Sequence, residues 1–428
     1  MSDRDTIFAL SSGRPPAAIS VIRISGPQAQ AAARGIAGSL PPEPRTAAVR
    51  ELRNPASREL LDEALVLRFD SPASSTGEDV VEFQCHGGRA VVDAVLAALS
   101  QVEGLRPAQP GEFTRRSFEN GRIDLTEAEG LADLIEAETE SQRKAALALA
   151  EGGLRKQTAV WQERVLNLAA RAERSIDYDE DDEIVDPSLL RDCAALATEL
   201  RDWLQRPRAE PLKDGVRVVV AGPPNTGKSS LINAIAGEER AIVTAVPGTT
   251  RDHIEVPLSL GGVPVRLTDT AGLRETEDEV EAIGVERAER LVEAADILVW
   301  LGAPGDSPGH SRTVLVHPKS DLPDRGTAPI GSLAISSATG EGLPSLLKEI
   351  ERLARAVLPG EDAVALNRRQ AQRLAEAADA LAGAAGARDL VLVAEHLRLA
   401  RVAFDRLTGR AGVEDVLDAL FGRFCLGK

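Results

Sequence analysis

The chain has few cysteines, few aromatic residues and no long apolar run. Three cysteines in 428 residues cannot form a disulfide framework, so we expect a reducing compartment such as the cytoplasm. Only 3% of the residues are aromatic, so the cores must be built from Leu, Val, Ile and Ala. No stretch approaches about 18 consecutive apolar residues, and the charged first ten residues lack the apolar segment of a signal peptide. A membrane-spanning or secreted protein is therefore not expected.

Positive charge is also in the minority. The chain has 67 Asp and Glu against 50 Lys and Arg, a formal net charge of −17. This balance disfavours a nonspecific polyanion binder, because a phosphate backbone attracts clustered positive charge. A local basic face could still bind nucleic acid. The remaining composition, 43% hydrophobic and 27% charged, is typical of a folded globular protein, and 428 residues suggest about two to four domains.

The first part of the chain, residues 1–119, has the pattern of a mixed α+β domain. Strand-like runs occur at Ala18–Ile24, Ala64–Phe69 and Val80–Cys85, and a helical pattern extends from Arg89 to Ser100. Pro and Gly clusters separate these runs.

The rest of the chain shows two kinds of sequence pattern. Residues 120–213 and 360–428 are rich in Ala, Leu, Glu and Arg at helical spacing, whereas residues 214–359 alternate short β-branched runs with helices. The latter pattern predicts a parallel sheet with crossover helices. We expect an α/β multidomain protein in which one helical domain is interrupted by an inserted α/β domain. Two separate helical domains are the alternative.

A phosphate-binding loop begins the inserted domain. Gly222–Ser229 fits G-x-x-x-x-G-K-[ST], follows the apolar run Val216–Ala221 and precedes the helical run Ser230–Ala236. The glycines let backbone N–H groups surround the β-phosphate, Lys228 neutralises the β and γ oxygens, and the Ser229 hydroxyl ligates Mg²⁺. The residues predicted to contact the nucleotide here are Asn225, Thr226, Gly227, Lys228, Ser229 and Ser230.

Two further motifs in the correct order predict a GTPase rather than a generic ATPase. A G-T-T segment at 248–250 supplies Thr250, and a D-T-A-G segment at 269–272 follows the strand-like run Val263–Thr268. Mg²⁺ prefers hard oxygen ligands, which suits Ser229 and Thr250 directly and Asp269 through water. The nucleotide contacts predicted in this part are Thr244, Ala245, Val246, Pro247, Gly248, Thr249, Thr250, Asp269, Thr270, Ala271 and Gly272.

Base recognition departs from the usual pattern. GTPases usually carry Asn-Lys-x-Asp after the fifth strand, but this chain has Pro-Lys-Ser-Asp at 318–321. Asp321 can pair with the guanine N1 and N2 hydrogens, whereas Pro318 lacks an amide, a loss of roughly 1–3 kcal/mol. We also predict base contacts for Lys319 and for Ser336 and Ser337, which begin a Ser-Ser-Ala loop. Only about a dozen residues, Gly302–Arg312, join two adjacent strands, so a crossover helix is expected to be missing.

The water-activating group cannot be chosen from the motifs alone. Leu273 stands where many small GTPases have a Gln, and Leu cannot orient water. The segment 274–281 contains five acidic residues, any of which could act as the general base, and a solvated acidic loop is the alternative. These residues are Glu275, Glu277, Asp278, Glu279 and Glu281.

Several motifs together resemble the tRNA-modification GTPase MnmE family, also called TrmE. They lie at both ends of the chain and around the G motifs, so the resemblance covers the whole length. In that family the helical domain is interrupted by a P-loop GTPase domain, and the N-terminal α+β domain binds folate and dimerises. The motifs are D-T-I at 5–7, I-R-I-S-G at 22–26, T-G-E-D at 76–79, H-G-G at 86–88, P-G-E-F-T at 110–114, N-G-R-I-D-L at 120–125 and F-C-L-G-K at 424–428.

The resemblance implies a homodimeric, K⁺-stimulated GTPase. It would form a heterotetramer with an FAD-dependent MnmG-type partner and modify C5 of the wobble uridine in certain tRNAs. The carbon donor would be 5,10-methylenetetrahydrofolate, for which 5-formyltetrahydrofolate is an analogue. By motif, the folate contacts are Arg23, Glu82, Arg122 and Lys428, with Arg122 standing where the family more usually has Lys.

The resemblance also assigns the ion and the reactive groups. Glu281 matches the family's water-activating glutamate, and Cys425 matches its functional cysteine although Leu426 replaces the common Ile. The K⁺ ligands would be Asn225, Thr244, Val246 and Thr249. Three alternatives remain open: a nucleotide-gated scaffold such as a ribosome-assembly GTPase, a decayed GTPase, and a merely structural surface ion pair between Arg23 and Glu82.

Overall fold

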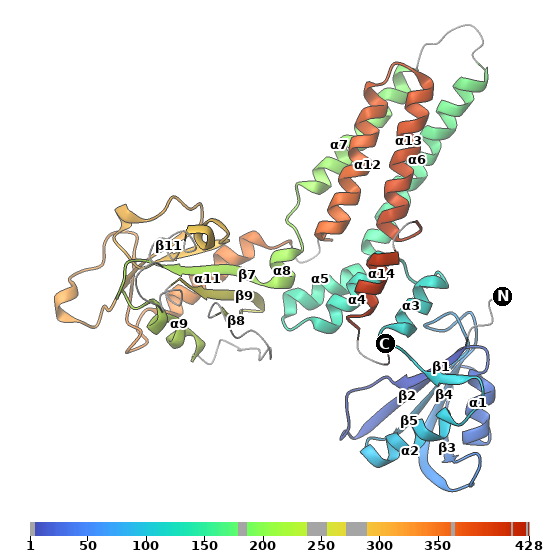
Figure 1. The fold of residues 1–428 in the computed structure, drawn as a ribbon. Coiled ribbons are helices and arrows are strands. Elements are labelled where there is room, and N and C mark those ends of the chain that lie inside the picture. Colours follow the sequence, from blue (N-terminus) through green and yellow to red (C-terminus); the bar gives the residue numbers. More distant parts are fainter. Residues whose placement is uncertain are drawn as a thin grey trace, which may run out of the picture. The chain divides into compact units, whose positions relative to one another are not determined.

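The structure is a computed structural model in which the chain forms two compact units (Figure 1). The first unit contains residues 1–132 and 408–428, and the second contains residues 133–407. The residues that the structure describes are 5–178, 186–237, 255–270, 289–360, 364–411, 414–424 and 427.

The first unit is built on a six-stranded sheet of order β3-β4-β5-β2-β1-β6. Only β1 and β6 are parallel to each other; the other neighbours are antiparallel. The sequence predicted β2, β4 and β5 but not the other three strands. The bounds are β1 Thr6–Leu10, β2 Ile19–Ser25, β3 Ala47–Arg53, β4 Leu60–Phe69, β5 Val80–His86 and β6 Leu105–Pro107.

Two helices bury one face of this sheet. They are α1 (Ala29–Ala37) and α2 (Arg89–Ser100), the second of which has the predicted bounds. Ile22 and Phe83 are fully buried in the core under these helices. Strand alternation therefore turns the neighbouring residues, such as Arg23 and Glu82, to the opposite face.

The C-terminal segment belongs to the first unit. Helices α3 (Glu112–Glu119), α4 (Leu125–Glu136) and α14 (Glu414–Phe421) supply a small apolar cluster that includes Phe421 and Phe424. The α4 residues up to 132 belong to this unit. The last helix of the chain is thus packed against α3 and α4.

The helical part of the second unit has one core made from both halves of the sequence. Trp161, Leu196, Leu374 and Phe404 are buried together in it, and the side chains of Trp161 and Phe404 stack with centroids 6.0 Å apart. The predicted single helical domain with an insertion is confirmed, and two separate helical domains are excluded. Its helices are α5 Glu140–Ala150, α6 Gly153–Tyr178, α7 Pro187–Leu204, α12 Arg368–Gly386 and α13 Leu390–Thr408. None of the described helices is long and apolar enough to cross a bilayer.

Side-chain caps set the starts of three of these helices. Thr139 and Gln142 form a capping box at α5, and Asn367 and Gln370 form another at α12. The Asp186 carboxylate accepts from the Ser188 N–H at the start of α7, where Pro occupies the first turn.

The inserted domain contains a second six-stranded sheet, of order β12-β11-β10-β7-β9-β8. Five strands are parallel as predicted, but β8 is antiparallel to β9 and was not predicted. Strand β8 precedes the two-residue Gly261–Gly262 turn that joins it to β9 in a hairpin, and its Pro257 and Ser259 interrupt the apolar pattern. The elements are α8 Glu210–Asp214, β7 Val216–Ala221, α9 Lys228–Ala236, β8 Glu255–Leu260, β9 Val263–Asp269, β10 Ile297–Trp300, β11 Thr313–Pro318, β12 Leu333–Ile335 and α11 Leu343–Val357.

The connection between β10 and β11 confirms the missing crossover helix. All of its residues are described, and it contains one 3₁₀ turn, Pro304–Asp306, and no α-helix. The connection between β11 and β12, likewise described throughout, also lacks an α-helix and contains a 3₁₀ turn, Pro323–Arg325, which the predicted alternation of strands and helices did not include. That alternation is confirmed at α9, which follows β7, and at α11, which follows β12.

The shared helical core generates a stability prediction. Leu374→Ala should lower the free energy of unfolding of the helical domain by about 2–5 kcal/mol, because Leu374 is fully buried and its truncation leaves a cavity. Leu166→Ala, the same change at a side chain 57% exposed in the same bundle, should change it by less than about 0.5 kcal/mol. Urea denaturation followed by circular dichroism measures both. Equal effects would contradict the placement of α12 in this core.

Candidate functional site

The carboxyl ends of three parallel strands gather the G motifs at one edge of the sheet. The phosphate loop follows β7, Asp269 ends β9, and the segment 318–321 ends and follows β11. In open parallel sheets this edge is where ligands bind, because the loops after neighbouring strands converge there. Motifs that are far apart in the sequence are thus brought together in one site.

Two glycines allow the phosphate loop its shape. Gly222 has φ +151°, and a Cβ there would lie 3.0 Å from the backbone carbonyl group of Leu301 at the end of β10. Gly227 has φ +96°, a left-handed conformation that glycine adopts without strain, and it immediately precedes α9. The loop can therefore place its backbone N–H groups beside those at the N-terminus of a nine-residue helix, so that both sets can bind one anion.

The polar side chains of the loop are held in place by short contacts. The Lys228 ammonium donates to the carbonyl oxygens of Gly222 at 3.0 Å and Pro223 at 2.9 Å. The Ser229 hydroxyl donates to the Asp269 carboxylate at 2.6 Å, and Asp269 is almost fully buried. Two oxygens expected around Mg²⁺ are thus adjacent, and this donor set of a hydroxyl and a carboxylate fits that ion.

The remaining described residues of these two motifs are also at this edge. Thr226 donates its hydroxyl to the Pro223 carbonyl at 2.8 Å, and Thr270 donates to the Val220 carbonyl at 3.0 Å. Ser230 is exposed in the first turn of α9, and Asn225 is exposed with φ +60°. Asn tolerates this left-handed conformation better than most residues.

The segment expected to contact guanine is tied to the phosphate loop. The Lys319 ammonium donates to the Asn225 carbonyl at 2.8 Å, and Asp321 is exposed two residues further on. Pro318 is buried and paired with Ile335 across β11 and β12, so its ring occupies the position where an Asn side chain would stand.

The second base loop is internally bonded. Ser336 is fully buried, and its hydroxyl accepts from the backbone N–H groups of Ala338 and Thr339 at 3.3 and 3.1 Å. Ser337 is half-buried beside it. The backbone of Ser320 donates to Ile335 at 3.1 Å, so the two base loops are bound to each other.

Part of the predicted site lies outside the described residues. This holds for the G-T-T segment and the residues before it, for the last two residues of the D-T-A-G motif, for the acidic segment, and for the last cysteine and the last lysine of the chain. The predicted residues concerned are Thr244, Ala245, Val246, Pro247, Gly248, Thr249, Thr250, Ala271, Gly272, Glu275, Glu277, Asp278, Glu279, Glu281, Cys425 and Lys428.

A second polar cluster lies on the sheet face of the first unit that is opposite α1 and α2. Arg23 and Glu82 are cross-strand neighbours, and the Arg23 Nε donates to the Glu82 carboxylate at 2.8 Å. Their side chains are 24% and 16% exposed, so the pair is accessible to a ligand without being an ordinary surface pair. The Arg23 guanidinium also lies 5.6 Å from the ring centroid of Phe113, which gives the cluster an aromatic wall.

A buried ion network supports this wall. Arg116, 5% exposed, binds the carboxylates of Glu78 and Glu112 at 3.1 Å each. Burial acts to raise the pKa of Glu112, but hydrogen bonds from Arg106, the Gln109 N–H and Arg116 hold the pKa below its ordinary value. Glu112 therefore stays ionised and fixes the start of α3, which carries Phe113.

The C-terminal tail is bound to the same sheet. Gly427 is buried, and its carbonyl accepts from the Ser11 hydroxyl at 2.7 Å. A Cβ on Gly427 would lie 1.9 Å from the Leu10 carbonyl oxygen, and its φ is +95°. Since Ala9, next to Leu10, pairs with Arg23, the tail reaches the strand that borders the polar cluster.

Arg122 lies in the same unit, whereas the two described cysteines, Cys85 in this unit and Cys193 in the second, have a different chemistry. Arg122 lies beside Gly77, where a Cβ would be 3.2 Å from the Arg122 Cγ. Burial, with a smaller contribution from Asp62, raises the pKa of the Cys85 thiol to about 12, and burial raises that of Cys193 to about 11. Neither thiol is suited to act as a nucleophile.

Sequence reasoning missed three residues of the second cluster. Phe113 belongs to the P-G-E-F-T motif, but no sequence pattern indicates its contact with Arg23, because the two residues are 90 positions apart in the sequence. Nothing in the sequence indicates the Ser11 contact with Gly427 either. Arg116 had no signal beyond being a basic residue on a short amphipathic helix.

Comparisons with known proteins identify the family of the chain. The family model for the MnmE helical domain matches residues 125–425, and that for the N-terminus of the GTP-binding protein TrmE matches residues 6–122. The G domain of the T. maritima FeoB iron transporter is 26% identical over 32% of this chain and 98% of its own, with a TM-score of 0.24 that carries no weight in the assignment.

Three curated relatives match over almost their full lengths, and all are named tRNA modification GTPase MnmE. The Erythrobacter litoralis protein is 51% identical over 99% of this chain and 100% of its own length. The Rhizorhabdus wittichii protein is 53% identical over 100% and 97%, and the Zymomonas mobilis protein is 50% identical over 99% and 100%. The chain therefore belongs to the MnmE family of tRNA modification GTPases.

Proposed function

We propose that this GTPase hydrolyses GTP in a K⁺-stimulated reaction that serves the modification of C5 of the wobble uridine in tRNA. A one-carbon tetrahydrofolate would supply the carbon, and an FAD-dependent MnmG-type partner would supply the redox chemistry. The observation that carries the proposal is the binding of Gly427 to Ser11. This contact brings the C-terminal tail to the domain that holds the Arg23–Glu82 cluster.

The nucleotide site supports the GTPase part of the proposal. Lys228 and the N-terminus of α9 provide positive charge for the phosphates, and Ser229 and Asp269 provide the oxygen donors for Mg²⁺. Asp321 would select guanine. We assign the activation of the attacking water to Glu281, the residue that matches the family's glutamate.

The Arg23–Glu82 cluster supports folate as the ligand of the N-terminal domain. A pterin ring is flat and presents adjacent N–H donors, which a carboxylate such as Glu82 can accept in pairs. Phe113 would provide an aromatic surface beside it, and the Arg23 guanidinium can stack on or donate to the ring. Arg122 and Lys428 would add positive charge for the carboxylates of the folate tail.

The tail supports a role for Cys425 in the same reaction. Phe424 is buried in the cluster with Phe421, and Gly427 is buried at Ser11, so Cys425 belongs to a two-residue span between two anchored positions. The other two cysteines of the chain are buried with raised pKa values. Cys425 is therefore our candidate for the reactive thiol.

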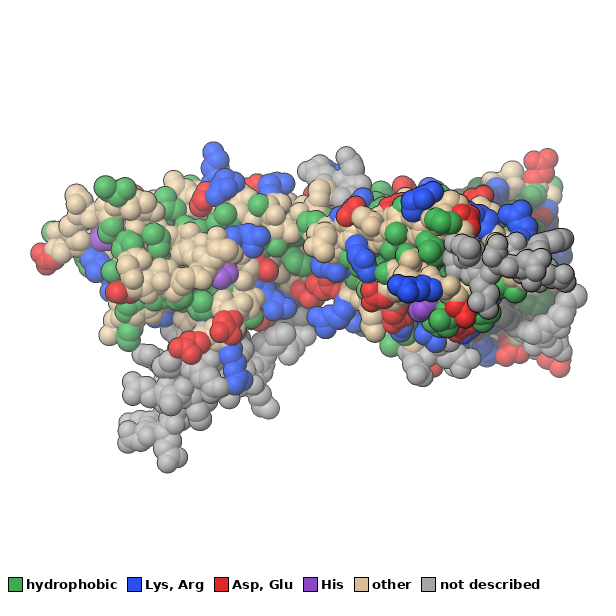
Figure 2. Space-filling view, turned by 90° about the horizontal axis from the view of Figure 1, so that it is seen from above, with side chains coloured by type: hydrophobic (Ala, Val, Ile, Leu, Met, Phe, Trp, Pro, Cys, Tyr) green, Lys and Arg blue, Asp and Glu red, His purple; other side chains and the backbone are tan. Residues whose placement is uncertain are grey.

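The charge distribution supports binding of the tRNA by this chain together with a partner subunit. Acidic and basic side chains are intermixed over the described part of the face that Figure 2 shows. Together with the net charge of −17, this favours a partner subunit that provides much of the positive surface. We accordingly propose a homodimer that binds two partner chains in a heterotetramer. The cytoplasmic setting stays a prediction.

Asn225 is the described residue of the proposed K⁺ site. Its side chain is exposed and its backbone is fixed, since the carbonyl accepts from Lys319 and the φ is +60°. An amide oxygen held in this way at the phosphate loop can ligate a monovalent cation. Thr244, Val246 and Thr249 would complete the shell, and the cation would stabilise the charge that develops on the phosphates.

The K⁺ site is tested by the choice of salt. GTP hydrolysis by the full chain should be about tenfold faster in KCl than in NaCl at equal ionic strength, because Na⁺ is too small for the same oxygen shell. Asn225→Ala should remove this difference, whereas Asn233→Ala, the same change at an exposed position of α9, should retain it. Steady-state phosphate release measures all three proteins. Equal rates of the unchanged chain in the two salts would contradict the K⁺ site.

The departure at Pro318 generates a second prediction. Pro318→Asn should tighten GTP and GDP together by about 5- to 100-fold, since the added amide contacts the base that both share. The backbone contact of residue 318 with Arg325, 3.1 Å from Nε to the carbonyl, does not depend on the Pro side chain. Asp321→Ala should instead remove the discrimination against ATP.

Titration with fluorescent guanine and adenine nucleotides measures both effects. If Pro318→Asn leaves the affinities unchanged, the side chain at 318 does not face the base, and the assignment of the segment 318–321 is wrong.

A further inference from the structure

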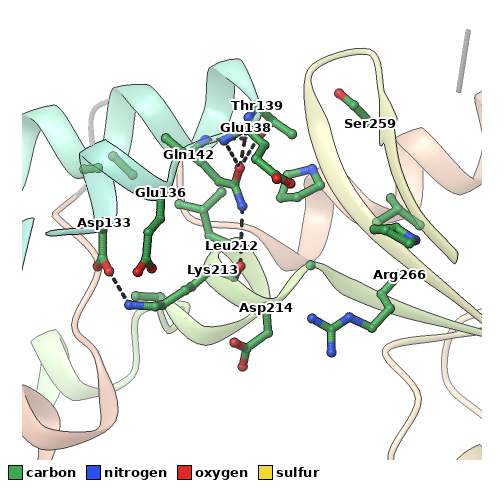
Figure 3. A pocket seen from close by; sticks show the side chains of 18 of the residues that line it. Asp133, Glu136, Glu138, Thr139, Gln142, Leu212, Lys213, Asp214, Ser259 and Arg266 are labelled. Atoms are coloured by element: carbon green, nitrogen blue, oxygen red, sulfur yellow. Dashed lines mark hydrogen bonds and ion pairs between the residues drawn. The ribbon is translucent and has the colours of Figure 1, made fainter. Parts of the chain in front are cut away.

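A cavity of about 310 Å³ lies within the second unit, away from the G motifs. Its walls come from the end of α4, from α5 and α8, and from the β8–β9 hairpin, so residues of the helical part and of the inserted domain face each other across it (Figure 3). This volume is at the lower end of the range for small-molecule sites, about 300–1,000 Å³.

The floor of the cavity is apolar. Leu149, Leu212, Leu258 and Val265 line it, and each is buried. Ala146 adds a small side chain at the same level. Such a surface favours an occupant with a compact apolar body, because water gains few hydrogen bonds there.

The rim of the cavity is acidic. It carries four carboxylates against two cations, a formal charge of −2, and both cations have a partner. Lys213 is paired with Asp133, and Arg266 with Glu255 at 3.2 Å. The remaining rim carboxylates are Glu136, Glu138 and Asp214, which Figure 3 labels. Each is exposed, and none has an ion pair with any residue that the structure describes.

Hydrogen bonds hold the opposing walls in place. The Gln142 Oε1 accepts from the backbone N–H groups of Glu138 and Thr139, both at 2.9 Å, and its Nε2 donates to the Lys213 carbonyl at 3.4 Å. On the other side the Ser141 N–H donates to the Gly262 carbonyl at 3.2 Å. The cavity is thus formed before any ligand binds, which lowers the entropy cost of binding.

We propose that this cavity is a binding site for a small organic cation with a compact apolar body. The apolar part would cover Leu149 and Leu258, and the cationic group would lie at the rim beside Glu136 and Asp214. An anion of the same shape is disfavoured, since the two rim cations are already neutralised by carboxylates. A polyamine without an apolar body would leave the floor uncovered. None of its lining residues belongs to the proposed GTP or folate clusters.

Tryptamine, a cation of about a dozen heavy atoms, is the probe. It should bind the full chain saturably with a dissociation constant of about 1 mM or less by isothermal titration calorimetry. Indole-3-acetate, with the same ring and the opposite charge, and 1,4-diaminobutane, with little apolar surface, should bind at least about tenfold more weakly. No saturable binding of tryptamine at 10 mM, a concentration about tenfold above the expected constant, would overturn the proposal. So would equal binding of indole-3-acetate.

Variants locate the binding. Glu136→Gln with Asp214→Asn should weaken tryptamine about 3- to 30-fold, because two rim charges are lost while two unpaired side chains keep their size. Ser259→Phe, which fills the cavity from the hairpin, should abolish the binding. Glu173→Gln with Asp306→Asn is the matched control, since both are exposed and neither lines the cavity. An equal loss of affinity in this control, or unchanged binding by both cavity variants, would show that tryptamine binds elsewhere and would contradict the site.

Discussion

The apolar core shared by α6, α7, α12 and α13 is the constraint on which the rest of the chain depends. It joins residues on both sides of the inserted domain, so the ends of that domain must lie close enough for α7 and α12 to pack together. Leu196 and Leu374, far apart in sequence, are fully buried in it. This core allows a GTPase domain to be inserted between α7 and α12, while the last residues of the chain belong to the first unit.

The contacts of the C-terminal tail within the first unit support the chemistry that we propose for the N-terminal domain. Phe421 and Phe424 bury two aromatic rings against α3 and α4, and Gly427 then fits against Leu10, where no side chain has room. These contacts anchor the tail on either side of Cys425. A reactive group at a free chain end would otherwise lose much conformational entropy on reaching its substrate.

The sequence predicts local features well and long-range contacts poorly. The phosphate loop and α2 were predicted with accuracy because their signals, glycine spacing and helical periodicity, are carried by neighbouring residues. The absent helix between β10 and β11 followed from chain length alone. Strand β8 was not predicted, because its Pro257 interrupts the apolar pattern. As an edge strand it depends on its pairing with β9, which no local pattern indicates. The contacts of Arg23 with Phe113 and of Ser11 with Gly427 exist only after folding, and no local signal foretells them.

We expect the anchored tail to be needed for tRNA modification but not for GTP hydrolysis. Gly427→Ala separates the two, because a methyl group at this position and φ of +95° would meet the Leu10 carbonyl and displace the tail. In cells with this variant as the sole copy, nucleoside mass spectrometry should show C5 modification of the wobble uridine reduced at least about tenfold.

The purified variant should hydrolyse GTP within about twofold of the unchanged chain, a difference well below 1 kcal/mol. Gly386→Ala, at a glycine with open space around it, should preserve both activities. Full modification in the Gly427→Ala strain would contradict the role assigned to the tail.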